Sequence, residues 1–248
     1  MKIVGIIPAR YASTRFPAKP LADIAGQTMI EWVYSQAKKS NSLDRVIVAT
    51  DNQKIYDHVK SKGGEVCMTS ENHVSGTDRC AEALASSNEE FDYVINIQGD
   101  EPFIDPRQID LLASLLDGKA EVATLIKKIT DRDALHNSNI VKVIYNAEHE
   151  AIYFSRSPLP HLRNVPKEKW FDQQDYFKHI GMYGYRTDIL GEITQLAPSS
   201  LELAESLEQL RWIENGYTIK VAETDIESMG IDTPEDLERA TEYLIKKK

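Results

Sequence analysis

The chain has 248 residues, 42% hydrophobic and 27% charged, and this composition predicts a folded protein with a sizeable core. Its formal net charge of −10 disfavours general binding to nucleic acids or anionic membranes, because the long-range field repels both. The two cysteines lack metal-like spacing, the first apolar run is too short for a signal-peptide core, and no stretch approaches a membrane span. We therefore expect a cytoplasmic protein with reduced thiols.

In the first half of the chain, short apolar runs alternate with amphipathic segments. The predicted strands are 3–7, 45–50, 65–68 and 93–98, and the predicted helices are 29–39, 54–62, 77–86 and 106–116. This β-α-β-α order predicts a parallel sheet with helices on both faces.

After about Val122 the pattern changes, and strands predominate. We expect strands at 122–129, 141–145, 151–155, 178–185 and 218–223, and helices at 201–214 and 233–245. Ser199 and Glu202 form a capping-box pattern before the first of these helices, and Thr233 precedes the second as its cap. The sheet is therefore expected to be mixed, in one domain with an inserted lobe.

A basic loop follows the first predicted strand. Residues 1–22 include Arg10, Arg15 and Lys19 but no acidic residue, and small residues such as Ser13 would let backbone N–H groups approach an anion. A guanidinium can donate two parallel hydrogen bonds to phosphate oxygens, so we favour phosphate binding over a merely solvated loop. Neither GxxxxGK[ST] nor GxGxxG is present here, which disfavours a P-loop ATPase and a dinucleotide-binding dehydrogenase.

Two aspartates could hold a metal ion beside such a loop. Asp100 follows an apolar strand in Gly-Asp-Glu-Pro, and a carboxylate that faces a triphosphate needs a cation such as Mg²⁺ between them. A simple turn or cap aspartate explains the motif equally well. For Asp232, immediately before Thr233-Pro234, the residues alone favour support of a helix start.

A turn at residues 75–79, Ser-Gly-Thr-Asp-Arg, leads into a predicted helix. It could present hydrogen-bond donors to a base or ribose, or it could be an ordinary helix cap. The residues do not decide between these alternatives.

These segments together resemble the 3-deoxy-manno-octulosonate (KDO) cytidylyltransferases, also called CMP-KDO synthetases. The matching segments are collinear over nearly the whole chain: 7–17, 75–79, 96–102, 153–156, 179–185, 207–211 and 230–237. Ala18 departs from the family pattern, which usually has glycine there, and this slightly stiffens the loop.

The resemblance implies a nucleotide-diphospho-sugar-transferase-like, Rossmann-like α/β fold with a mixed, mostly parallel sheet flanked by helices. The single domain, 1–248, would have a nucleotide-binding part at roughly 1–120 and 215–248 and a sugar-binding and dimerisation lobe at roughly 121–214. The implied reaction transfers CMP from CTP to the anomeric hydroxyl of KDO and releases pyrophosphate, for lipopolysaccharide synthesis. A homodimer and a Mg²⁺ cofactor are also implied.

Site residues carried over from the family fall into three groups. Those for the nucleotide are Arg10, Ser13, Arg15, Lys19, Ser75, Thr77, Arg79 and Asp100, and those for the metal are Asp100 and Asp232. Of these, Arg15, Lys19, Asp100 and Asp232 would be catalytic. Those for the sugar are Gln98, Arg156, His179, Tyr183, Glu208 and Gln209. For this last group, a mixed polar strand and a solvated helix face that carries Glu205, Gln209 and Arg211 remain the alternative.

Other functions stay open at this point. A cytidylyltransferase for sialic acid or 8-amino-KDO would share the phosphate and metal chemistry. A metal-dependent glycosyltransferase of similar sheet topology typically has an Asp-x-Asp motif, whereas Glu101-Pro102 follows Asp100 here. A non-catalytic nucleotide-binding regulator would be signalled by loss of the metal carboxylates, and both are present.

Overall fold

A computed structural model of the chain describes residues 1–12, 16–227 and 230–247. Its backbone divides into two compact units, Met1–Ala113 with Glu227–Lys248, and Ser114–Ile226. The segment 218–223 belongs to the second of these units, and the division into nucleotide-binding and sugar-binding parts stays a prediction. Among the described residues, no helix is long and apolar enough to span a membrane.

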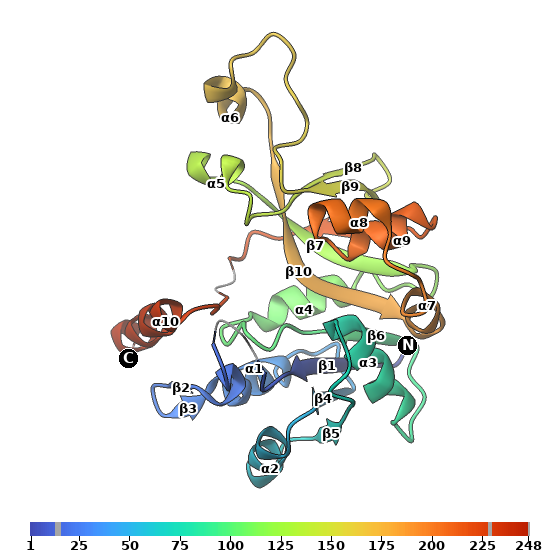
Figure 1. The fold of residues 1–248 in the computed structure, drawn as a ribbon, viewed down its shortest axis with the longest axis vertical. Coiled ribbons are helices and arrows are strands. Elements are labelled where there is room, and N and C mark those ends of the chain that lie inside the picture. The colour runs from blue at the N-terminus through green and yellow to red at the C-terminus, as the bar shows by residue number, and fades with distance from the viewer. Residues whose placement is uncertain (13–15, 228–229, 248) are drawn as a thin grey trace. The chain divides into compact units, whose positions relative to one another are not determined.

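The first unit is built on four parallel strands in the order β6-β1-β4-β5, and Figure 1 shows these strands with their helices. The strands are β1 (Ile3–Ala9), β4 (Arg45–Thr50), β5 (Val66–Met68) and β6 (Tyr93–Asn96), with a small hairpin of β2 (Asp23–Ile24) and β3 (Gln27–Thr28) outside the sheet. Nearly every residue of β1, β4 and β6 is buried, as expected for strands covered on both faces.

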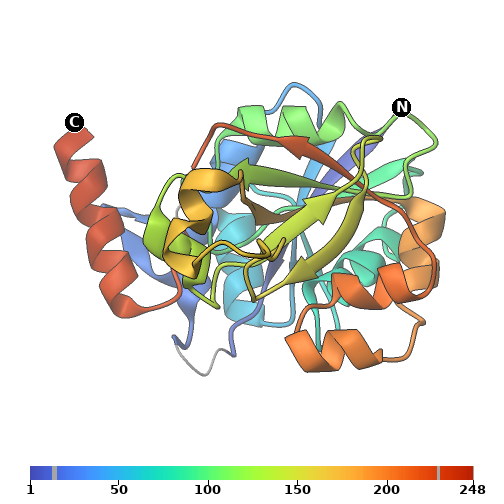
Figure 2. The ribbon, with the colours of Figure 1, turned by 90° about the horizontal axis from the view of Figure 1, so that it is seen from above.

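The described residues of this unit form five α-helices and one 3₁₀ turn: α1 (Met29–Ala37), α2 (Gln53–Ser61), α3 (Gly76–Ala85), α4 (Pro106–Ala113), α10 (Pro234–Lys247) and η1 (Lys19–Leu21). The strand order reverses after β5, so right-handed crossovers place α1 and α2 on one face of the sheet and α3 on the other. Figure 2 shows α10 beside the β2–β3 hairpin, and a small core joins them through Ile24, Met29, Ile231 and Ala240.

The second unit has the mixed pairing expected from its sequence. Its strands are β7 (Val122–Lys128), β8 (Lys142–Tyr145), β9 (Ala151–Ser155), β10 (Phe177–Arg186) and β11 (Ile219–Glu223). β11 runs parallel to β7, whereas β7–β10, β10–β8 and β8–β9 are antiparallel. Its helices are α5 (Arg132–His136), α6 (Trp170–Gln173), α7 (Thr187–Ile193), α8 (Ser200–Glu205) and α9 (Gln209–Glu214), with η2 (Lys167–Lys169) before α6.

The single helix expected at 201–214 is wrong, because the segment forms two helices, α8 and α9. The capping box of Ser199 and Glu202 is confirmed at the start of α8. Ser206 adopts a left-handed conformation with φ 52°, which ends α8. The next residue, Leu207, is buried. The break turns the segment back on itself, so that α9 packs beside α8 (Figure 1).

Candidate active site

The parallel strands of the first unit bring polar residues to one edge of its sheet. Tyr11 lies just beyond β1, Asp51 directly follows β4, and Thr69 directly follows β5, while Asp100 lies a few residues beyond β6. Because parallel strands end at a common edge, these residues share the edge where ligands of open α/β sheets bind.

The basic loop is closed at its base by a backbone hydrogen bond. The N–H of Ala18 donates to the carbonyl oxygen of Tyr11 at 3.0 Å, and Ala18 itself is left-handed with φ 58°. A glycine would adopt this conformation without strain, which explains physically why glycine suits the position. Arg10 is exposed at the start of the loop, and Ser13 and Arg15 lie outside the described residues.

Lys19 brings the two predicted metal-binding aspartates together. Its Nζ donates to Asp100 Oδ2 at 2.9 Å, to the main-chain oxygen of Ile231 at 2.9 Å and to Asp232 Oδ1 at 3.3 Å. The Lys19 side chain is only 15% exposed, so these contacts are partly shielded from water. Three acceptors match the three N–H groups of an ammonium.

Asp232 is not the cap of α10. Thr233 Oγ1 accepts the N–H of Asp236, and Asp236 Oδ2 accepts the N–H groups of Asp232 and Thr233. Burial acts to raise the pKa of Asp236, but these backbone donors outweigh it and hold the pKa below its usual range. The predicted cap at Thr233 is confirmed. The Asp232 carboxylate approaches Lys19, and support of the helix start by its negative charge stays an alternative.

The pair of carboxylates fits a magnesium ion. Asp100 and Asp232 both lie within hydrogen-bonding distance of one ammonium, so their oxygens converge on a single cationic group. No group of three or more His, Cys, Asp or Glu side chains gathers as a metal site in the part of the chain that the structure describes. Mg²⁺ takes few protein carboxylates and completes its shell with water and phosphate oxygens, so two hard carboxylates suit it, whereas a closed zinc site needs more protein ligands.

The turn at residues 75–79 serves α3 directly. Ser75 is the N-cap, and its hydroxyl accepts the N–H of Asp78 at 3.1 Å. Thr77 is buried, and Arg79 is completely buried with its guanidinium paired to Asp51 at 2.8 Å. The alternative of an ordinary cap is confirmed for Ser75, and direct contact of these three residues with a nucleotide stays a prediction.

The six predicted sugar-binding residues divide between the units. Gln98 follows β6 in the first unit, and the other five, Arg156, His179, Tyr183, Glu208 and Gln209, belong to the second. Arg156 donates to three main-chain oxygens, those of Ser138, Glu205 and Ser206, at 2.7–3.3 Å. It thereby ties the end of β9 to the turn between α8 and α9.

His179 and Tyr183 belong to an aromatic cluster on β10. The His179 ring packs against Phe154 and Tyr183 with centroids 5.2 and 5.1 Å apart, and its Nε2 lies 3.0 Å from Thr124 Oγ1. Burial lowers the pKa of His179 to about 3, although the residue as a whole is only half-buried, so the ring is neutral at pH 7. The Tyr183 hydroxyl is buried without a hydrogen-bond partner among the described residues, and burial raises its pKa.

The solvated helix face that we kept as an alternative is wrong. Gln209 is 5% exposed, Arg211 binds Glu202 with two hydrogen bonds, and Glu205 accepts hydrogen bonds from Ser155 and the Arg156 amide. Polar groups that are buried and paired in this way hold a defined geometry.

Two further residues contact predicted site residues, and neither was predicted from the sequence: Asp51, which binds Arg79, and Thr124, which lies beside His179. Asp51 could have been found by the argument used for Asp100, since it directly follows the apolar strand at 45–50. Thr124 lies within a buried strand, and nothing in its local sequence points to His179.

The chain is similar to known proteins over nearly its whole length. Residues 4–224 match the cytidylyltransferase family. The chain is 57% identical to a 3-deoxy-manno-octulosonate cytidylyltransferase of Cytophaga hutchinsonii, over 97% of each protein, and 55% identical to one of Bacteroides thetaiotaomicron, over 98% of each. A solved structure of CMP:2-keto-3-deoxy-manno-octonic acid synthetase complexed with CTP superimposes with a TM-score of 0.93 at 40% identity and covers both chains fully. The chain therefore belongs to the 3-deoxy-manno-octulosonate cytidylyltransferase family.

Proposed function

We propose that the chain transfers CMP from CTP to the anomeric hydroxyl of KDO and releases pyrophosphate. The similarity to proteins that carry this name, at up to 57% identity over nearly the full length, is the observation that carries the proposal. The cluster of Lys19, Asp100 and Asp232 supplies the residue types that the chemistry needs. In the reaction the sugar oxygen forms a bond to the α-phosphorus, the bond from this phosphorus to the β-phosphate oxygen breaks, and the hydroxyl proton is lost.

On the nucleotide side, cationic side chains would bind the phosphates and carboxylates would bind the metal ion. Lys19, Arg10 and the undescribed Arg15 would neutralise the phosphates and the leaving pyrophosphate, and Ser13 would add a hydroxyl contact. Asp100 and Asp232 would hold Mg²⁺, which when bound would offset triphosphate charge and lower the pKa of the attacking hydroxyl. Lys19 would move from the two carboxylates to phosphate oxygens when the nucleotide binds.

On the sugar side, polar groups of the second unit would orient KDO, and Gln98 of the first unit stays a predicted sugar contact. His179, neutral at pH 7, would act as a hydrogen-bonding group and not as a charge. The Tyr183 hydroxyl, without a partner among the described residues, would gain one from a sugar hydroxyl, and Glu208, Gln209 and Arg156 would complete the contacts. We further propose a cytoplasmic homodimer whose product serves lipopolysaccharide synthesis.

The test is pyrophosphate release by the purified protein from CTP, with KDO and Mg²⁺ supplied separately and together. We expect release only when both are present, and CTP should be preferred over ATP. Sialic acid and 8-amino-KDO belong in the same assay. Efficient release with either of them and none with KDO would reassign the sugar while leaving the nucleotide chemistry intact. Light scattering of the same sample tests the dimer.

A further inference from the structure

Arg79 is a completely buried arginine at the edge where the strands of the first unit end. Its side chain is 0% exposed. Nη2 donates to Asp51 Oδ2 at 2.8 Å, and Nη1 donates to Thr69 Oγ1 at 2.5 Å and to the main-chain oxygen of Ser70 at 3.2 Å. The planar guanidinium therefore joins α3 to the residues that follow β4 and β5, a geometry that a point-like ammonium cannot reproduce.

Asp51 extends this connection to the base of the basic loop. Its Oδ1 accepts the backbone N–H of Tyr11 at 3.4 Å, while Oδ2 binds Arg79. The carbonyl oxygen of Tyr11 accepts the N–H of Ala18, and this hydrogen bond closes the loop. Lys54 also lies over the Tyr11 ring, 5.5 Å from its centroid. Tyr11 is thus held through its N–H, its carbonyl and its ring.

A second branch leads from α3 to the segment after β5. Glu82, one turn beyond Arg79 on α3, accepts the N–H of Ser70 at 2.8 Å and binds His73. Thr69 is itself joined to the end of β4, because its N–H donates to the Thr50 carbonyl at 2.8 Å. Arg79 therefore lies at the junction of two branches, one towards the loop and one towards residues 69–73.

We propose that Arg79 is a positioning residue for the phosphate-binding loop, and that it acts through Asp51 on the Tyr11 amide. The inference rests on the proposed function, since that function assigns the triphosphate to this loop. Because the Arg79 side chain has no exposed surface, we argue its effect through the groups that it holds and not through direct contact with a ligand. Fixing Tyr11 fixes the closing bond to Ala18 and hence the start of η1, where Lys19 stands. Preorganisation of this kind lowers the cost of ordering a loop on binding.

The branch to the loop can be broken by conservative changes. Asp51→Asn keeps the shape of the side chain and the acceptor for the Tyr11 N–H but removes the negative charge that Arg79 binds. Arg79→Lys keeps the positive charge but loses the planar set of N–H donors. Thr69→Val removes one acceptor of Arg79 on the side of residues 69–73, the Thr69 hydroxyl, and leaves the contact with Asp51 in place. If Arg79→Lys fails to fold, Asp51→Asn remains a near-isosteric test of the same link.

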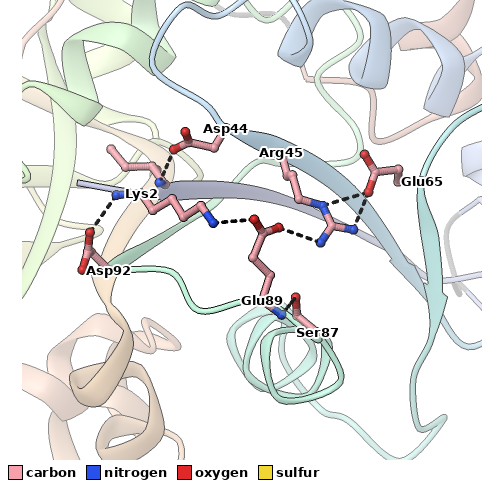
Figure 3. A network of polar contacts seen from close by, with 8 residues as sticks. Lys2, Asp44, Arg45, Glu65, Ser87, Glu89 and Asp92 are labelled. Carbon is pink, nitrogen blue, oxygen red and sulfur yellow. Dashed lines mark hydrogen bonds and ion pairs between the residues drawn. The ribbon is translucent and has the colours of Figure 1, made fainter.

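Arg45→Lys is the matched control. Arg45 also pairs with carboxylates, Glu65 and Glu89, in the network that includes Lys2 and Asp92 (Figure 3). It lies at the start of β4, whereas Asp51 follows the end, and the six residues of this strand span roughly 20 Å. The control therefore weakens a guanidinium–carboxylate link of the same unit at the opposite edge of the sheet.

The measurement is the dissociation constant for CTP and for CMP by calorimetry, with the melting temperature recorded for each variant. We expect Asp51→Asn and Arg79→Lys to weaken CTP binding at least about tenfold and CMP binding much less, because the loop holds the outer phosphates. The double variant should bind CTP no more weakly than the single variant with the lower CTP affinity, because both substitutions disrupt the same contact between Arg79 and Asp51. Thr69→Val and Arg45→Lys should keep the ratio of CTP to CMP affinity of the wild type.

Three results would overturn the proposal: a fall in melting temperature with unchanged CTP affinity, an equal loss for CTP and CMP, or a loss in Arg79→Lys that Asp51→Asn does not share. The last would mean that Arg79 does not act through Asp51. Wild-type turnover with CTP and KDO separates these results from failure of the proposed function, because an inactive wild type would refute that function first.

Discussion

The carbonyl oxygen of Pro8 lies 2.5 Å from the position that a Cβ at Gly99 would occupy. Pro8 is near the end of β1, and Gly99 directly precedes Asp100, so the absence of a side chain lets the carboxylate segment run against the base of the basic loop. The backbone N–H of Ile231 donates to the Asp100 carbonyl at 2.9 Å and adds the segment of Asp232 to this contact. The positions of all three segments are therefore coupled through main-chain contacts.

Gly99→Ala should lower both stability and activity. The added methyl group would overlap a backbone oxygen, and overpacking of this kind costs about 1–3 kcal/mol. The shift that relieves it must displace Asp100 from Lys19, so we expect kcat/KM to fall at least about tenfold. Gly191→Ala is the control, since its Cβ would meet nothing within 4 Å inside α7 and alanine favours a helix by roughly 1 kcal/mol. Equal behaviour of the two variants in kinetics and melting would refute the coupling.

Ala18→Gly should stabilise the protein slightly or leave it unchanged. The left-handed conformation at φ 58° costs alanine about 1–2 kcal/mol relative to glycine, while glycine gives back roughly 0.4–1 kcal/mol through the greater freedom of the unfolded chain. The net expectation is a gain of about 0–1.6 kcal/mol in the free energy of unfolding measured with denaturant, with catalysis retained. A clear loss of stability would mean that the loop closure at Tyr11 does not need this conformation.

His179 should contribute to acid destabilisation. Its pKa is about 3 when folded and near 6.5 when unfolded, so between these values the unfolded chain binds the extra proton. Stability should therefore rise with pH from about 3 to about 6.5 by at most about 1.4 kcal/mol per pH unit from this group, with no contribution above pH 7. His179→Gln should flatten the unfolding free energy in that window. An unchanged pH profile would show that the ring is not buried as described.

Gln209 should affect the sugar and not the nucleotide. It is buried at the start of α9, and loss of a hydrogen bond to a sugar group would raise KM for KDO by about tenfold. We expect Gln209→Ala to show this rise with KM for CTP within about twofold of the wild type. Gln195→Ala, at an exposed position, serves as the control. An increase in KM for CTP alone would place Gln209 outside the sugar site.

Local sequence was sufficient for much of the fold. The strands expected at 45–50 and 151–155 are β4 and β9 with the same limits, because β-branched residues bounded by polar segments mark such strands well. The caps at Ser199 and Thr233 were also predictable, since each depends on residues within one helical turn.

Features that depend on distant residues were not predictable in this way. The break at Ser206 follows from burial of Leu207 and from the Arg156 contact to the Ser206 carbonyl, and neither has a local signal. Burial of Arg79 depends on where β4 places Asp51, 28 residues away. Likewise, the residues around Asp232 indicate a helix start. Only the fold shows that the Asp236 carboxylate accepts the backbone N–H of Asp232 while the Asp232 carboxylate contacts Lys19.

The central claim is that Asp100 and Asp232 act on the nucleotide as one metal-binding pair. Asp232 is 51% exposed, so losing its charge should cost at most about 1 kcal/mol of stability, or a few degrees in Tm. Metal assistance is worth several kcal/mol in a transition state, and each ~1.4 kcal/mol is about tenfold in rate.

The most direct measurement is kcat/KM for pyrophosphate release from CTP and KDO by wild type, Asp100→Asn, Asp232→Asn and the double variant, with Mn²⁺ binding in the presence of CTP followed on the same samples. We predict a fall of at least about a hundredfold in each single variant, weakened Mn²⁺ binding, and a double variant far from additive. A folded Asp232→Asn protein with normal turnover at limiting Mg²⁺ and unchanged Mn²⁺ binding would contradict the claim.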